Sequence, residues 1–84
     1  MKSIEKLREK IDIIDNKIVE LLNLRLDVIR DVVIYKKVNN LSVEDKAREK
    51  DIIERIKKLT NDPEIINIYE AIIEECKNFQ KKHV

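Results

Sequence analysis

One apolar stripe constrains the fold of this chain more than any other feature of its 84 residues. The stripe runs from residue 4 to residue 35 at spacings that alternate between three and four, which is typical of one face of an α-helix. Its positions are Ile4, Leu7, Ile11, Ile14, Ile18, Leu21, Arg25, Val28, Val32 and Tyr35. Neither proline nor glycine interrupts this segment, so the sequence predicts one very long helix over residues 4–38, with Ser3 as its N-cap.

Two shorter helices are expected in the rest of the chain. Asn39 and Asn40 interrupt the pattern, because asparagine tolerates the left-handed conformation that ends a helix. Ser42 is followed three residues later by Asp45, which resembles a capping box and predicts a second helix over residues 44–59. The apolar face of that helix would carry Ile52, Ile53, Ile56 and Leu59.

The third helix has a start signal of its own. Asp62 as N-cap and Pro63 at the first helical position predict a helix over residues 63–82. Its apolar face would carry Ile65, Ile66, Tyr69, Ile72, Ile73, Cys76 and Phe79. We therefore expect an all-α fold with three helices per chain, in a single domain of residues 1–84.

The composition excludes several classes of protein. Glycine is absent and proline occurs once, which argues against a β-sandwich or barrel and against a glycine-rich nucleotide site. The 18 Lys and Arg against 17 Asp and Glu give a net charge of +1, which argues against a nucleic-acid partner. One cysteine and one histidine cannot form an internal disulfide or a metal cluster, so no metal is expected. Because the chain has neither a membrane-spanning apolar run nor an apolar segment at its start, we expect a cytoplasmic protein with no membrane partner.

The length of the first helix predicts an assembly. Thirty-odd residues make a helix roughly 50 Å long, whereas a compact domain of this size has a radius of gyration of about 12 Å. The helix must therefore extend beyond its own domain, and its stripe stays apolar along the extension. An intertwined homodimeric helical bundle would cover that stripe.

Polar residues stand at positions where a helical bundle would carry apolar ones. Arg25 interrupts the stripe, and Lys36 returns to nearly the same face eleven residues later. Arg48, Glu49 and Gln80 lie on inward or near-inward faces of the other two helices. Each residue also has a purely structural interpretation. Arg25 would form a salt bridge inside the bundle or extend its guanidinium to the surface, the others would occupy solvated surface or helix-end positions, and Cys76 would be a small core residue. Together they would line an interior that suits a small dianion with hydroxyl groups.

Five motifs in order resemble the AroQ-class chorismate mutases. They are LREKID at residues 7–12, LLNLR at 21–25, Lys36, DKARE at 45–49 and IIEECKNFQ at 72–80. The resemblance covers residues 4–81 and implies an all-helical, intertwined homodimer. It implies the Claisen rearrangement of chorismate to prephenate for phenylalanine and tyrosine biosynthesis, with no cofactor. Such a pericyclic reaction is catalysed by holding the substrate in a compact conformer and by stabilising charge on its ether oxygen.

The resemblance also implies a set of site residues. Arg25 and, from the second subunit, Arg8 would bind the two carboxylates, while Lys36 and Gln80 would donate to the ether oxygen. Glu49 would accept from the ring hydroxyl, helped by the backbone of Asp45, and Arg48 would add positive potential near a carboxylate. Cys76 stands where the family usually has serine, and a thiol is the weaker donor. Val32 and Ile73 would form apolar walls.

Two other functions compete with this interpretation. An isochorismate-pyruvate lyase uses the same fold and a similar anion pocket. A non-catalytic helical dimerisation module would share the apolar stripe, but it gives no reason for Arg25, Lys36, Glu49 and Gln80 to converge.

Overall fold

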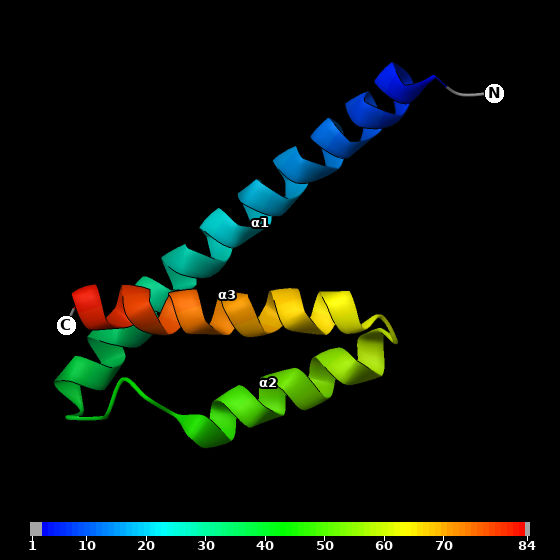
Figure 1. Ribbon diagram of the computed structural model, residues 1–84. Helices are drawn as coiled ribbons and strands as arrows, with labels where there is room; N and C mark the ends of the chain where they lie inside the picture. The colour runs from blue at the N-terminus through cyan, green and yellow to red at the C-terminus, as the bar shows by residue number, and fades with distance from the viewer. Residues whose placement is uncertain (1–2, 84) are drawn as a thin grey trace.

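The computed structural model describes residues 3–83, and these contain three α-helices and no strand. The helices are α1 (Ile4–Val38), α2 (Lys46–Leu59) and α3 (Pro63–Lys82) (Figure 1). The prediction of an all-α chain with three helices is confirmed. Residues 1, 2 and 84, at the ends of the expected 1–84 domain, lie outside the described residues.

Both ends of α1 are capped by the residues that the sequence indicates. The Ser3 hydroxyl accepts a hydrogen bond from the Lys6 backbone N–H at 3.3 Å. At the other end Asn40 adopts a left-handed conformation with φ of 56°. The backbone N–H groups of Leu41 and Asn40 donate to the carbonyls of Lys36 and Lys37, which is a Schellman motif. Asparagine thus ends this long helix in a chain that has no glycine.

The start of α2 differs from the prediction. The helix begins at Lys46, two residues later than expected, and its N-cap is Asp45 instead of Ser42. The Asp45 carboxylate accepts from the Arg48 backbone N–H at 3.0 Å, which satisfies a donor that the first turn leaves unpaired. The later start keeps residues 39–45 outside any helix, and this segment passes along the end of α3. Asp62 does precede α3 with Pro63 at its first turn, but the Asp62 side chain makes no capping hydrogen bond.

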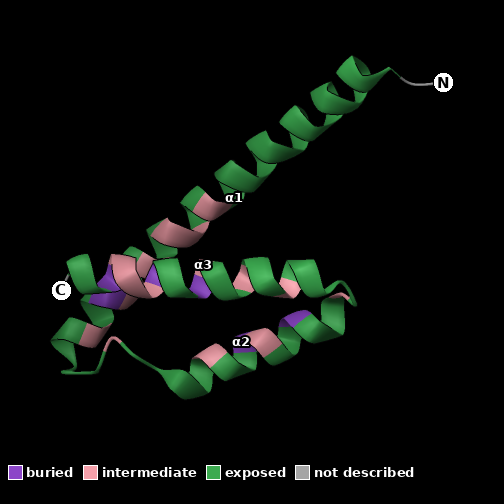
Figure 2. Ribbon diagram, in the orientation of Figure 1, coloured by how far each residue is buried: buried purple, intermediate pink, exposed green. Residues whose placement is uncertain are grey.

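A small core holds the three helices together. α3 packs against both α1 and α2 (Figure 1). Ile52 and Ile56 of α2 and Ile73 of α3 form the buried cluster, and Ile53, Ile66 and Tyr69 pack around it. Figure 2 shows that the buried residues lie where the helices approach one another. The predicted apolar faces of α2 and α3 pack together at their centres, whereas Leu59 at the end of one face and Ile65 at the start of the other are exposed in the single chain.

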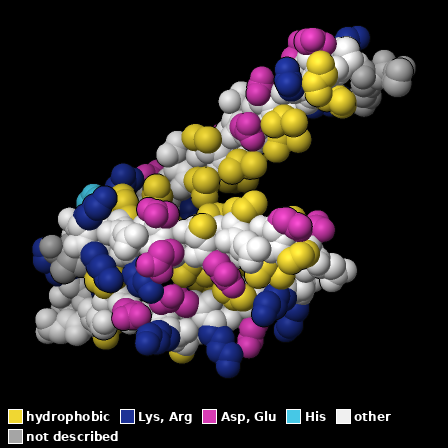
Figure 3. Space-filling view, viewed as in Figure 1, with side chains coloured by type: hydrophobic (Ala, Val, Ile, Leu, Met, Phe, Trp, Pro, Cys, Tyr) yellow, Lys and Arg dark blue, Asp and Glu magenta, His cyan; other side chains and the backbone are white. Residues whose placement is uncertain are grey.

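The N-terminal half of α1 is exposed along its whole length in the described structure. Every residue from 4 to 21 is exposed, including the stripe residues Ile11, Ile14 and Ile18, of which about half of each surface is exposed. The chain measures 57 × 24 × 16 Å and its radius of gyration is 16.2 Å, well above the ~12 Å expected for a compact domain of this length. Figure 3 shows hydrophobic side chains along the edge of α1 that faces α3 and along the facing edge of α3.

Only the C-terminal half of α1 contributes to the core. Val33 is buried there, although it lies outside the apolar stripe, whereas the stripe residues Val28 and Tyr35 stay exposed. Most of the stripe therefore does not pack against the other helices of the same chain. None of the described helices is both long and apolar enough to cross a membrane.

Candidate active site

The three helices enclose a pocket of about 550 Å³ beside the core. Its volume lies in the range of small-molecule sites. The predicted site residues that line it are Arg25, Val32, Lys36, Asp45, Arg48, Glu49, Ile73, Cys76 and Gln80. All three helices contribute, so the pocket exists only in the folded chain. Arg8 is the one predicted site residue that does not line it.

Arg25 lies half-buried in the pocket wall without a carboxylate partner. Its Nη1 donates to the Cys76 Sγ at 2.8 Å, and its guanidinium lies 5.9 Å from the centre of the Tyr69 ring. Among residues 3–83 it forms no ion pair, so no salt bridge within the described part of the chain accounts for Arg25. A guanidinium held by a thiol and an aromatic ring keeps its charge and most of its donors for an anion.

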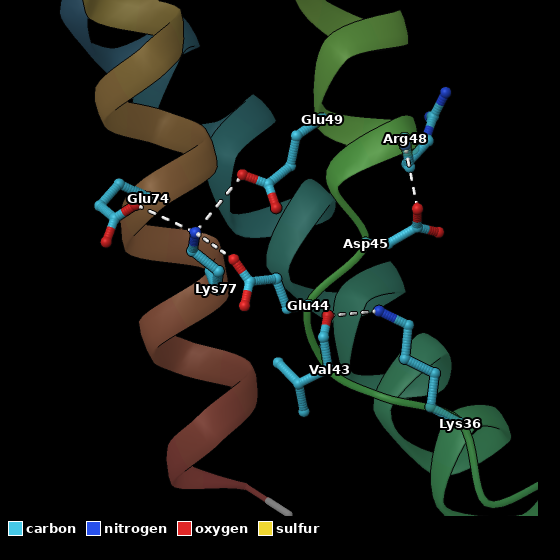
Figure 4. Close-up of polar contacts among 8 residues, drawn as sticks. All are labelled: Lys36, Val43, Glu44, Asp45, Arg48, Glu49, Glu74 and Lys77. Atoms are coloured by element: carbon cyan, nitrogen blue, oxygen red, sulfur yellow. Dashed lines mark hydrogen bonds and ion pairs between the residues drawn. The ribbon is translucent and has the colours of Figure 1, made fainter.

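Lys36, near the end of α1, and Gln80, near the end of α3, meet at the pocket. The Lys36 Nζ donates to the Val43 carbonyl at 2.9 Å and to the Gln80 Oε1 at 3.1 Å (Figure 4 shows the first contact). Gln80 is buried at 8% exposure, so it does not belong to a fraying turn. Because its carbonyl oxygen accepts from Lys36, its amide nitrogen remains a donor. An ammonium and an amide donor therefore lie next to each other.

Glu49 is held by a lysine that the sequence analysis did not single out. The Lys77 Nζ lies 3.4 Å from the Glu49 Oε1, 3.4 Å from the Glu74 Oε2 and 3.7 Å from the Glu44 Oε1 (Figure 4). Burial alone would lower the pKa of Lys77, but the carboxylates of Glu49 and Glu74 outweigh it and raise that pKa above 10.5. Lys77 is therefore a stable cation at the pocket wall.

Asp45 and Arg48 stand at the rim of the pocket. Both are exposed although they line it, so Arg48 is less inward than its sequence position suggests. The Asp45 carboxylate is engaged in capping α2, which fixes the turn that leads into Glu49. The exposed Arg48 side chain points away from Glu49 (Figure 4).

The apolar part of the wall is broader than predicted. Val32 and Ile73 line the pocket as expected, and buried Cys76, which accepts a hydrogen bond from Arg25, lines it as well. The residues missed by the sequence analysis of the site are Leu24, Val28, Ile29, Val43, Ile52 and Lys77. Helical spacing could have found Lys77, because it follows Ile73 by four residues and precedes Gln80 by three.

Arg8 lies far from this pocket within its own chain. It is exposed on the unpartnered half of α1, seventeen residues before Arg25, which is roughly 25 Å along the helix axis. The pocket therefore holds Arg25, Lys36, Arg48 and Lys77 as its cations, and Asp45 and Glu49 as its acids. Such a site can bind a small anion on one side and accept a hydrogen bond from a hydroxyl on the other. In the described part of the chain, no three His, Cys, Asp or Glu side chains are grouped so that they could hold a metal ion.

Comparison with known proteins agrees with this arrangement. Residues 7–81 match the protein family described as chorismate mutase type II. The chain belongs to this family. A chorismate mutase from Methanocaldococcus jannaschii is 34% identical over 89 aligned residues, which cover 100% of this chain and 90% of that protein. A bifunctional chorismate mutase/prephenate dehydratase from Aquifex aeolicus is 32% identical over 90 residues, which cover 98% of this chain and 25% of the larger protein.

The match to the chorismate mutase type II family extends over the whole pocket. It begins before Arg8 and ends after Gln80, so it contains all of α2, nearly all of α1 and α3, and every residue that lines the pocket. Resemblance to the AroQ-class chorismate mutases, which the sequence motifs indicate, is thus confirmed.

Proposed function

We propose that this chain is a cytoplasmic chorismate mutase that rearranges chorismate to prephenate as a homodimer, with residues 1–84 as one catalytic domain. The observation that carries the proposal is the convergence of Arg25, Lys36, Glu49 and Gln80 on one pocket formed by three helices. Chorismate is a dicarboxylate with a ring hydroxyl and an ether oxygen. The four side chains provide a guanidinium, an ammonium, a carboxylate and an amide, which complement those groups.

The contacts support a division of roles. Arg25 has no carboxylate partner among residues 3–83, so it is available to bind one substrate carboxylate with two parallel hydrogen bonds. Lys36 Nζ and the amide of Gln80 are adjacent, so both can donate to the ether oxygen, where negative charge develops as the C–O bond breaks. Glu49 accepts from the ring hydroxyl at the opposite side of the pocket. Val32 and Ile73 provide apolar walls against which the substrate folds, while Arg48 adds positive potential at the rim.

Catalysis of this kind rests on restraint and electrostatics. The rearrangement is intramolecular and needs no nucleophile, so the pocket has to select a compact conformer and stabilise charge. Cys76 would contribute little to binding a carboxylate, because its sulfur already accepts from Arg25 and a thiol is a weak donor.

The second copy is required to cover α1 and to bring Arg8 to the pocket. The exposed stripe residues Ile4, Ile11, Ile14 and Ile18 form a continuous apolar surface that water would meet in a monomer. A two-fold axis perpendicular to α1 makes the same stripe its own partner and places one α1 antiparallel to the other. Arg8 of the partner subunit then supplies the guanidinium for the second carboxylate.

The position of Arg8 fixes the centre of this pairing. Antiparallel helices that bring Arg8 of the partner subunit opposite Arg25 must cross midway between residues 8 and 25, between Asn16 and Lys17. The stripe residues around that centre, from Ile11 to Leu21, are exposed, and the pairing would cover them. The pairing that completes the site therefore also covers exposed apolar surface.

The experiment is to incubate the purified protein separately with chorismate and with isochorismate and to identify the products. The proposal expects conversion of chorismate to prephenate and no comparable release of pyruvate from isochorismate. Pyruvate release as the main reaction would mean a lyase. If a folded protein acts on neither compound and a dianionic bicyclic mimic of the transition state gives no protection from thermal unfolding, the chain is a structural helical module.

A further inference from the structure

Lys77 is the one charged residue of the pocket wall whose interactions all go to carboxylates. It comes from α3, and its three partners come from three different places: Glu44 from the segment before α2, Glu49 from α2 and Glu74 from its own helix. Only 16% of the Lys77 side chain is exposed, whereas Glu44 and Glu74 are 46% and 61% exposed. The lysine is thus more buried than any of its partners and lies at the centre of the group (Figure 4).

Among the three partners, only Glu49 faces the pocket. Glu49 and Lys77 both line it, but Glu44 and Glu74 do not. The Glu49 side chain is 28% exposed, and its hydrogen bond with the Lys77 Nζ at 3.4 Å is the only side-chain hydrogen bond that Glu49 makes in the described structure. A glutamate side chain has three rotatable bonds and samples several rotamers when nothing holds it, so the contact with Lys77 restricts where the Glu49 carboxylate lies. The contact leaves the second carboxylate oxygen, Oε2, as an acceptor.

The local charge makes the same residue important for a dianionic ligand. Glu44, Glu49 and Glu74 place three negative charges at one side of the pocket, and Lys77 is the cation among them. Without it, a dicarboxylate would approach an uncompensated acidic cluster through a partly desolvated pocket, where screening is weak.

We propose that Lys77 is a positioning residue for the reaction: it fixes the Glu49 carboxylate in the orientation that receives the substrate hydroxyl and offsets the surrounding carboxylates. This inference rests on the proposed function, since Glu49 needs a substrate hydroxyl to receive. Lys77 acts through Glu49 and does not itself contact the reacting atoms.

A merely structural role for Lys77 makes a different prediction. If the lysine only ties α3 to the segment before α2, its removal lowers stability and activity together, whichever residue stands at position 49. If it positions the Glu49 carboxylate through their ion pair, most of its effect on kcat/KM disappears once position 49 no longer carries a carboxylate, and only the small part that comes from offsetting Glu44 and Glu74 remains. A double-mutant cycle separates these cases.

The test measures kcat/KM for chorismate in the wild type, Lys77→Met, Glu49→Gln and the double variant, each verified as a folded dimer. We expect Lys77→Met to lower kcat/KM about 10- to 100-fold, the scale of a misplaced binding group. Adding Lys77→Met to Glu49→Gln should lower it by less than threefold further. Lys77→Arg should recover most of the loss, because it keeps the charge and can donate to the same carboxylates.

Matched controls use residues outside the pocket. Lys58→Met removes an exposed lysine of α2, and Glu74→Gln removes a partner of Lys77 that does not line the pocket. Both should stay within threefold of the wild type. Equal losses from Lys77→Met in the wild-type and Glu49→Gln backgrounds would overturn the positioning role, as would an unchanged Lys77→Met enzyme. A folded wild type without activity on chorismate would overturn the proposed function and this inference together, whereas an active wild type with an unaffected Lys77→Met variant would overturn this inference alone.

Discussion

Replacing Lys36 with methionine tests the electrostatic part of the proposed function. The change keeps most of the side-chain volume and removes the ammonium that lies between the Val43 carbonyl and Gln80. In the proposed site, this ammonium lies at hydrogen-bond distance from the ether oxygen during bond breaking. The variant should therefore lose activity much more than stability.

The magnitude follows from the contacts. A full charge about 3 Å from an oxygen that gains about half a charge contributes about 2–3 kcal/mol at an effective dielectric constant near 20. Losing the hydrogen bond that orients Gln80 adds about 1 kcal/mol. The total of about 3–4 kcal/mol corresponds to a fall of roughly 10²- to 10³-fold in kcat/KM, which matches the loss of one oxyanion donor. The free energy of unfolding should fall by only about 1–2 kcal/mol, because the Val43 carbonyl loses its hydrogen-bond donor.

The assay follows chorismate disappearance and, separately, thermal unfolding. The neighbouring Lys37 is exposed in the last turn of α1 and does not line the pocket, so Lys37→Met is a matched control that should keep full activity. A folded Lys36→Met protein with turnover within about threefold of the wild type would refute the electrostatic role of Lys36.

Three further substitutions test other parts of the structure. Ile14→Asp should convert the proposed dimer to a monomer in sedimentation experiments, because the two-fold pairing buries residue 14 of both subunits. The control Asn16→Asp, on the opposite face of α1, should remain dimeric. If both variants are dimeric, the proposed interface is wrong. Cys76→Ser should lower the KM for chorismate about two- to tenfold, since a hydroxyl is the stronger donor; a higher KM would show that the thiol contact with Arg25 is needed. Glu49 and Glu74 raise the Lys77 pKa, so above pH 10.5 the lysine loses its proton in unfolded chains before it does in folded ones. The Tm difference between the wild type and Lys77→Met should therefore shrink above pH 10.5. A Tm difference that is independent of pH would contradict this ion-pair account.

The sequence predicted the helices well because their signals are local. Ser3, Asn40 and Pro63 act through their own backbone geometry, and the structure has them where the pattern predicts. The start of α2 was misplaced because Ser42 and Asp45 are both good caps, and local preference alone cannot choose between them. The tertiary contact of Lys36 with the Val43 carbonyl fits the later start, since it holds residue 43 outside the helix.

The pocket was predicted less completely than the helices. Arg25, Lys36 and Gln80 stood out because polar residues interrupt apolar faces, and all three line the pocket. Lys77 did not stand out, since a lysine beside glutamates on a helix is usually a solvated residue, and only the packing of α3 against the segment before α2 brings Glu44 to it.

The most direct measurement of the central claim is the activity of a mixture of Arg8→Ala and Arg25→Ala proteins after subunit exchange. Each variant alone should be nearly inactive, because every site of its dimer lacks one guanidinium. Random exchange makes half of the dimers mixed, and each mixed dimer has one intact site and one site without either arginine, so roughly a quarter of the wild-type activity should return. No return of activity despite demonstrated exchange would contradict a site built from Arg25 of one chain and Arg8 of the partner subunit.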